Sequence, residues 1–121
     1  MTSSRYSNVP PTLGDRLIHI LTAIEDIRAA LAGRSLEDFT ADPLRRMAVE
    51  RLFEIMSEAS RYIPDEMKDR EKNIAWQKLA DLGNLLRHAY HRVDPNILWE
   101  IVENDLESLK RFVERVVQNE K

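Results

Sequence analysis

The fold is decided by one stretch, residues 75–93, which reads AWQKLADLGNLLRHAYHRV. Its apolar side chains return every three or four residues, the spacing that places them on one face of an α-helix. They are Trp76, Leu79, Ala80, Leu82, Leu85, Leu86 and Ala89. Asp94–Pro95 follows directly and supplies an N-cap and a first-turn proline for the next helix. The stretch therefore predicts one helix over about residues 75–93 and another starting at Pro95.

The same spacing predicts two helices before this stretch and one after it. They cover residues 13 or 15 to 32, residues 42 to 63, and residues 95 to 118. Gly33 tolerates the positive φ of a C-terminal cap, so it ends the first helix. Pro43 stands at the first position of the second helix, and Pro64 ends it.

Short segments link the predicted helices. Residues 1–11 form a polar tail whose Pro10–Pro11 pair cannot lie inside a helix. Ser35–Phe39 is a connector, and residues 65–73 form a loop or a short turn of helix. We therefore expect a tail over residues 1–11 and one domain over residues 12–121. Four amphipathic helices with short links predict an all-α, antiparallel four-helix bundle.

The overall composition narrows the class of protein. Hydrophobic residues make up 43% of the chain and charged residues 32%, which is a globular balance rather than a disordered one. The net charge of −3 gives no global attraction to nucleic acid, so RNA binding requires a local basic patch. The absence of cysteine excludes disulfides and thiol nucleophiles. No apolar run is long enough for a membrane span, and residues 1–11 contain no signal-peptide core, so we expect a cytoplasmic protein without membrane contact.

Five polar side chains gather near the C-terminal end of the 75–93 helix. They are Asn84, Arg87, His88, His91 and Arg92. On a helix, His88 lies one turn after Asn84 and one turn before His91 and Arg92, while Arg87 pairs with His91. An imidazole that takes a hydroxyl proton and a guanidinium that stabilises a charged phosphorane are parts of phosphodiester chemistry. We take His88, Arg87 and Asn84 as candidate catalytic residues, and Arg87, His91 and Arg92 as candidate phosphate- or RNA-binding residues.

Other interpretations of these residues remain. A histidine and two arginines also occur on ordinary solvated helix faces, and spacing alone favours that interpretation. His88 and His91 could both ligate a metal, but no acidic ligand lies near them on the same face. His19 stands alone in the first predicted helix and is interpreted as a partly buried or surface histidine. We predict no metal and no cofactor.

The motif Asn84–Leu85–Leu86–Arg87–His88–Ala89–Tyr90, followed by Val93–Asp94 and Trp99, resembles the HepT-like branch of the HEPN superfamily. That branch typically reads Arg-Asn, three residues, His, one residue, Tyr, then Val-Asp and a Trp. The similarity covers about residues 13–116. Further positions in the expected order are Phe39, Pro43–Glu50, Glu58–Ala59, Trp76, Trp99–Val102 and Asp105–Leu106.

The resemblance implies both a fold and a function. Family members are helical homodimers that bring two copies of the motif together in a cleft. Many are metal-independent endoribonucleases that act as toxins, with a small nucleotidyltransferase as the cognate antitoxin. Matched by position, His88 is the catalytic histidine and Asn84 the polar residue that follows the arginine. Tyr90 matches the tyrosine that the antitoxin adenylylates in at least some pairs.

One position departs from the family pattern. The family's arginine falls at Gly83, which has neither charge nor side-chain donors. Arg87 lies one turn along on the same face, where its long side chain could reach the same phosphate. A small residue at position 83 could instead permit close approach of another helix, or a different ligand. The ribonuclease motif is therefore degenerate.

Two functions remain open. One is a HepT-like ribonuclease in which His88 is the general base and Arg87 or Arg92 stabilises the phosphate. The other is a catalytically weakened HEPN dimer that binds a nucleotidyltransferase, RNA or a nucleotide. Gly83 favours the second, whereas Asn84, His88 and Tyr90 favour the first. A helical bundle without a site would leave the coincidence of these three positions unexplained.

Surplus apolar surface predicts a homodimer. The last two predicted helices have more apolar side chains than a narrow stripe needs, and such a surplus usually marks an interface. The side chains concerned are Leu79, Leu82, Leu86, Ile97, Ile101 and Val102.

Overall fold

The structure is a computed structural model that describes residues 9–88 and 93–119 of the chain. Within these residues it contains seven α-helices and no β-strand, which confirms the predicted all-α class. The helices are α1 (Leu13–Leu31), α2 (Leu36–Thr40), α3 (Pro43–Ser60), α4 (Asp65–Asp69), α5 (Trp76–His88), α6 (Pro95–Asn104) and α7 (Leu106–Asn119).

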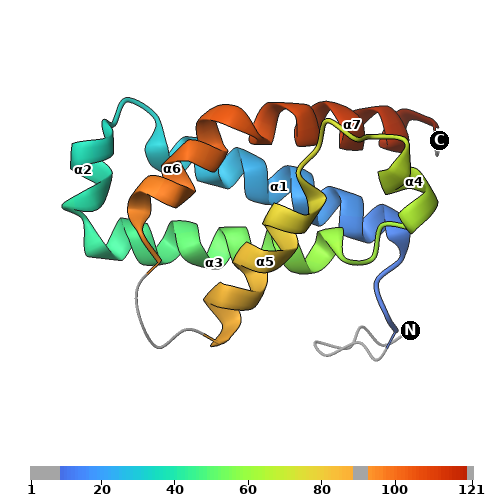
Figure 1. Cartoon of the computed structure of the whole chain (residues 1–121), viewed down its shortest axis with the longest axis horizontal. Helices are drawn as coiled ribbons and strands as arrows, with labels where there is room; N and C mark the ends of the chain where they lie inside the picture. Colours follow the sequence, from blue (N-terminus) through green and yellow to red (C-terminus); the bar gives the residue numbers. More distant parts are fainter. Residues whose placement is uncertain (1–8, 89–92, 120–121) are drawn as a thin grey trace, which may run out of the picture.

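The long helices form an antiparallel bundle around α1. Figure 1 shows α1 lying against both α3 and α7 along the long axis of the molecule, with α3 running in the opposite direction to α1. α5 packs across α3, and α6 contacts both α2 and α7. This arrangement places the last turn of α5 beside the outer surface of α3.

The predicted helix starts are confirmed by their caps. Thr12 and Asp15 form a capping box, in which Asp15 N donates to Thr12 Oγ1 at 3.1 Å and Thr12 N donates to Asp15 Oδ2 at 2.9 Å. Asp42 caps α3 through a bond from Arg45 N, with Pro43 in the first turn. Asp94 caps α6 in the same way, through a bond from Asn96 N at 2.9 Å.

Two segments predicted as links contain short helices. The connector at residues 35–39 is helical as α2, because Ser35 and Asp38 form a second capping box at its start. The segment 65–73 contains α4, in agreement with the expected short turn of helix. α2 contributes the fully buried Phe39 to the core, where its ring lies 6.0 Å from that of Trp99.

Two predicted helix boundaries need correction. The helix predicted over residues 95–118 is broken at Asp105, whose φ of −117° departs from the helical value, and α6 runs at an angle to α7 (Figure 1). The apolar spacing continues across this break, so periodicity did not reveal it. The helix predicted to reach Val93 has ended before that residue, which is not helical; residues 89–92 lie outside the described part of the chain.

One continuous core holds the helices together. Its largest fully buried side chains are Leu17, Ile20, Ile24, Ile27, Phe39, Phe53, Met56, Ile63, Leu98, Ile101, Leu106 and Leu109. They come from α1, α2, α3, α6 and α7 and from the turn after α3. The start of α5 is fixed to α7 by Trp76 and Phe112, whose rings meet edge to face with centroids 5.4 Å apart. α5 is therefore held at its start by α7 and along its length by α3.

Candidate active site

The described part of the motif, Asn84–His88, occupies the second half of α5, where this helix crosses α3. Leu79, Leu82 and Gly83 are buried, whereas Asn84, Arg87 and His88 are exposed. The helix thus presents its catalytic candidates on the side away from the core.

α5 and α3 approach each other closely at Gly83. A Cβ atom built at position 83 would lie 1.9 Å from Ser57 Oγ and 2.5 Å from Ser57 Cβ, so no side chain fits there with the helices in place. The Ser57 hydroxyl donates a buried hydrogen bond of 2.8 Å to the carbonyl of Leu79, one turn before Gly83. Of the two explanations for glycine at this position, the structure supports close helix approach.

Arg87 is fixed by contacts on two sides. Its guanidinium donates to Asn84 Oδ1 at 2.9 Å and pairs with Glu58 Oε1 of α3 at 3.2 Å. The same Glu58 oxygen pairs with Arg61 at 3.1 Å. Asn84 and Arg87 are three residues apart on one helix, but the sequence gave no reason to connect them with Glu58 of α3.

His88 is the last residue of α5 and is exposed to solvent. No described residue forms a hydrogen bond or ion pair with its imidazole. As far as the described residues are concerned, both ring nitrogens are therefore open to a ligand. Tyr90, His91 and Arg92 lie outside the described residues. The expected contacts of His88 with His91 and Arg92, and of Arg87 with His91, therefore stay predictions.

A small hollow beside Arg87 adds residues that sequence reasoning missed. It has a volume of about 210 Å³, and we call it the α1–α3 groove. Its lining side chains are Arg16 and His19 from α1, Arg51, Glu54, Ile55, Glu58 and Ala59 from α3, and Arg87. His19 is on the surface, in agreement with one of its two expected interpretations. It also borders a second hollow of about 160 Å³ further along α1 and α3.

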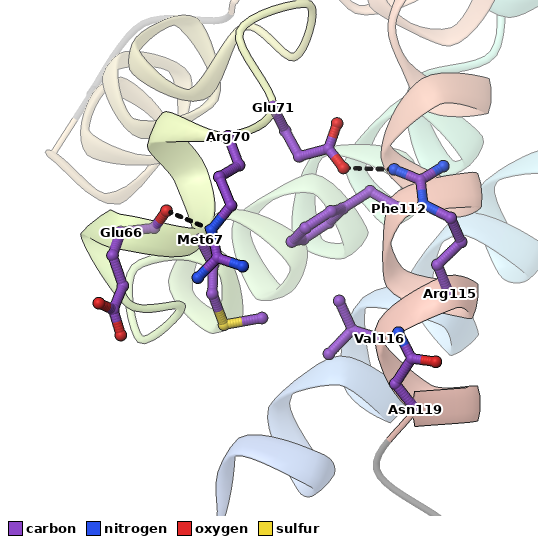
Figure 2. Close-up of a pocket in the computed structure, with 8 residues that line it drawn as sticks. All are labelled: Glu66, Met67, Arg70, Glu71, Phe112, Arg115, Val116 and Asn119. Carbon is purple, nitrogen blue, oxygen red and sulfur yellow. Dashed lines mark hydrogen bonds and ion pairs between the residues drawn. The ribbon is translucent and has the colours of Figure 1, made fainter.

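Another cavity of the described residues lies elsewhere, between α4 and α7 (Figure 2). It has a volume of about 430 Å³ and contains none of the predicted site residues. Figure 2 shows that its two arginines already have partners, since Arg70 Nε donates to the carbonyl of Glu66 and Arg115 pairs with Glu71. Arg115 is therefore paired with a carboxylate, whereas Arg70 is hydrogen-bonded to a backbone carbonyl.

The exposed apolar surface from which we predicted a dimer is smaller than expected. Leu79, Leu82 and Ile101 are buried within the single chain, and Leu86 and Val102 are partly buried. Leu85 and Ile97 remain 50% and 43% exposed, on either side of a shallow hollow between α5 and α6. These two side chains adjoin the motif helix, so a dimer formed there would bring two motifs near each other.

Within residues 9–88 and 93–119, no three His, Cys, Asp or Glu side chains are close enough together to hold a metal ion. In the same residues, no helix is both long enough and apolar enough to cross a membrane.

Comparison with known proteins agrees with this arrangement of residues. The family model described as "Ribonuclease HepT-like" matches residues 20–116, which include all of the motif and most of the bundle. The chain belongs to the HepT-like family. Its fold is accordingly the helical bundle of that family, and the resemblance noted in the motif is confirmed.

Several HepT-like relatives align over most of their length. A "Probable ribonuclease HepT" of Thermococcus cleftensis is 38% identical over 84% of this chain and 93% of that protein. A protein of Methanocaldococcus jannaschii named as a "Putative RNase" is 34% identical over 83% of this chain and 92% of its own. Another of that description, from Caldanaerobacter subterraneus subsp. tengcongensis, is 32% identical over 87% and 94% of the two chains. No solved structure matches the chain significantly.

Proposed function

We propose that this chain is a metal-independent endoribonuclease and the toxin component of a HEPN/nucleotidyltransferase toxin–antitoxin module. The observation that carries the proposal is the guanidinium of Arg87, fixed by Asn84 and Glu58, on the residue that directly precedes the exposed His88 at the end of α5. Membership of a ribonuclease family supports RNA as the substrate.

In the proposed reaction, His88 takes the proton of an RNA 2′-hydroxyl. The 2′-oxygen then attacks the adjacent phosphorus, the bond to the 5′-oxygen of the next nucleotide breaks, and that oxygen receives a proton. The products are a 2′,3′-cyclic phosphate and a 5′-hydroxyl. Arg87 stabilises the charge that develops on the phosphorane, with Asn84 holding the guanidinium in place. His91 and Arg92 complete the RNA-binding set in this proposal.

The proposal also includes two protein partners. A second copy of the chain would pack on Leu85 and Ile97, which are exposed beside the motif helix. A minimal nucleotidyltransferase antitoxin would transfer AMP from ATP to Tyr90, with release of pyrophosphate. Family membership and the tyrosine two residues after His88 support this partner. Because RNA and such an enzyme meet in the cytoplasm, the proposal places the protein there.

The alternative is a catalytically weakened HEPN dimer that binds a nucleotidyltransferase, RNA or a nucleotide. The ion pair between Arg87 and Glu58 favours it, because a carboxylate already occupies part of the guanidinium that a phosphate would need. Gly83 favours it too, since position 83 has no room for the family's arginine. Binding of RNA without cleavage would identify this alternative.

The test is an RNA cleavage assay in EDTA with purified protein. We expect cleavage by the wild type, 2′,3′-cyclic phosphate ends on the products, and loss of at least about a hundredfold in His88→Ala. Arg87→Gln should also lose activity. Its matched control is Arg28→Gln, because Arg28 likewise forms an ion pair between two helices, with Glu107 at 2.9 Å, and is similarly exposed. Equal cleavage by wild type and His88→Ala would reject His88 as the general base, and no cleavage by the wild type would reject the ribonuclease.

A further inference from the structure

Arg16, in the α1–α3 groove, has no carboxylate partner among the described residues. Its guanidinium carbon lies 3.6 Å from the centroid of the Tyr62 ring. Its Nε is buried and has no hydrogen-bond partner, and no described residue forms an ion pair with it. Stacking on an aromatic ring covers one face of a guanidinium but leaves its in-plane N–H groups available to an anion.

The carboxylates near Arg16 have other hydrogen-bond or ion-pair partners. Asp15, its neighbour in sequence, accepts a hydrogen bond from Thr12 N, and this bond is the main reason why the pKa of its carboxyl lies below the usual value, which the charges of His19 and Arg16 lower further. Glu54 pairs with Arg51 at 3.3 Å, and Glu58 pairs with Arg87. The lining of the groove includes three arginines against two glutamates, before His19 is counted. The groove therefore has a positive excess, concentrated at Arg16.

The groove is also continuous with the proposed active site. Arg16 and Arg87 line the same hollow, and Arg87 is followed directly by His88. At about 210 Å³ the hollow is below the usual size of a site that encloses a whole ligand of drug size, which is about 300 Å³ or more. It has the size and charge to take a phosphate with part of its sugar.

We propose that Arg16, with Arg51 and His19, forms a second phosphate subsite that holds the RNA backbone next to the phosphate cleaved at Arg87 and His88. This inference rests on the proposed ribonuclease function, because it assigns the groove to the same RNA strand. It goes beyond that function, because it predicts that the RNA substrate needs a second phosphate for efficient binding and cleavage. Guanidinium groups bind phosphate through charge-assisted, bidentate hydrogen bonds. Arg16 is therefore better suited to bind phosphate than an ordinary surface cation.

The first experiment measures binding of a labelled single-stranded RNA oligonucleotide to protein with the His88→Ala change, which prevents cleavage. Arg16→Gln and Arg51→Gln should each weaken binding, Arg16→Gln by about tenfold. The slope of log affinity against log salt should fall by about 0.7 when one phosphate contact is lost. Arg111→Gln is the matched control for Arg51→Gln, because both arginines are highly exposed and pair with a glutamate on their own helix.

The second experiment compares two substrates of the cleaving enzyme. A dinucleoside monophosphate has one phosphate and cannot fill the second subsite, whereas a longer oligonucleotide can. Arg16→Gln should lower kcat/KM for the oligonucleotide by about tenfold and leave that for the dinucleoside unchanged. A merely structural role of Arg16 would lower both. Arg16→Lys keeps the charge but loses the planar stack, so it should give an intermediate loss and guards against a folding defect in the glutamine variant.

The outcomes separate the two proposals. Unchanged affinity and salt slope in Arg16→Gln, or an equal loss in Arg111→Gln, would overturn the subsite while leaving the ribonuclease intact. RNA binding that depends on Arg16 without any cleavage by the wild type would overturn the ribonuclease and keep the subsite. Competition by inorganic phosphate as strong as that by RNA would show a general anion site, which also overturns the proposal.

Discussion

Gly83 and Ser57 are in contact at the crossing of α5 and α3, and a Cβ atom on the glycine would overlap the serine side chain. In the HepT-like motif, this is the position at which the resemblance places an arginine. The contact gives a structural reason for glycine in place of the family's arginine, because it makes Gly83 part of the packing of the motif helix. Arg87, one turn later, faces the same helix and pairs with its Glu58.

Gly83→Ala should therefore destabilise the protein. Overpacking of a closed contact costs about 1–3 kcal/mol, which exceeds the gain of up to about 1 kcal/mol that alanine gives inside a helix. Urea unfolding measures the difference. Gly14→Ala is the control, because its new Cβ would come no closer than 3.7 Å to Thr12 Oγ1 and should leave stability unchanged or raise it. A Gly83→Ala variant as stable as Gly14→Ala would contradict the close contact.

Much of the fold could be predicted from the sequence, since apolar spacing and the caps Asp42–Pro43 and Asp94–Pro95 mark local structure. The break at Asp105 could not, because the apolar period continues through it. α2 was missed because it is only five residues long, although Ser35 and Asp38 have the spacing of a capping box.

The candidate site was predictable only within one helix. Asn84, Arg87 and His88 could be grouped because their spacing on α5 fixes their directions. Glu58 and Arg16 could not be added, because their positions depend on how α5 and α1 pack against α3. Helix–helix packing depends on close contacts such as that of Gly83 with Ser57. The residue pattern does not specify which residue of another helix Gly83 contacts.

The apolar pair Leu85 and Ile97 should form the centre of a dimer. Leu85→Glu places a charge on that surface, and burial of an unpaired charge costs more than a dimer interface can recover. We expect the mass from light scattering to change from that of a dimer to that of a monomer. Leu44→Glu is the control, since Leu44 is 76% exposed on α3 and lies outside this surface. A wild type that is monomeric at micromolar concentration would contradict the prediction.

The capping box of α2 should make stability depend on pH. The hydrogen bond from Ser35 N holds the pKa of the Asp38 carboxyl below its usual value. A lowered folded-state pKa means that the ionised carboxylate stabilises the fold above the unfolded pKa, and that this contribution is lost as the pH falls through the folded pKa. The stability difference between wild type and Asp38→Asn should therefore shrink from about pH 5 downward in thermal unfolding. A stability difference that does not change with pH would contradict this contribution of Asp38.

Tyr90 should accept AMP from the cognate nucleotidyltransferase. The added phosphate would lie close to Arg87 and His88 in sequence and compete with RNA for the same cations. Coexpression with the nucleotidyltransferase encoded beside it, followed by mass spectrometry, should show an increase of one or more AMP units. The increase should be absent in Tyr90→Phe. An increase that persists in Tyr90→Phe, or none with an active partner enzyme, would reject the modification at this residue.

Glu58 should act as a positioning residue for Arg87. Its Oε1 forms ion pairs with both Arg87 and Arg61, so it holds the guanidinium of Arg87 against α3 beside Asn84. Glu58→Gln keeps the shape but weakens the charge-assisted pair, which leaves Arg87 free to adopt other directions. Because both partners are more than a quarter exposed, we expect a moderate effect, a fall in kcat of about tenfold.

The division between kcat and KM tests this role of Glu58. A carboxylate that positions Arg87 supports the transition state, so its loss lowers kcat without raising KM. A carboxylate that only competes with phosphate would, when removed, tighten RNA binding and leave kcat unchanged. Glu107→Gln is the matched control, because Glu107 also pairs with two arginines, Arg28 and Arg111, but on α1 and α7. Tighter binding with an unchanged kcat in Glu58→Gln would identify Glu58 as an inhibitory partner of Arg87 and would favour the weakened-dimer alternative.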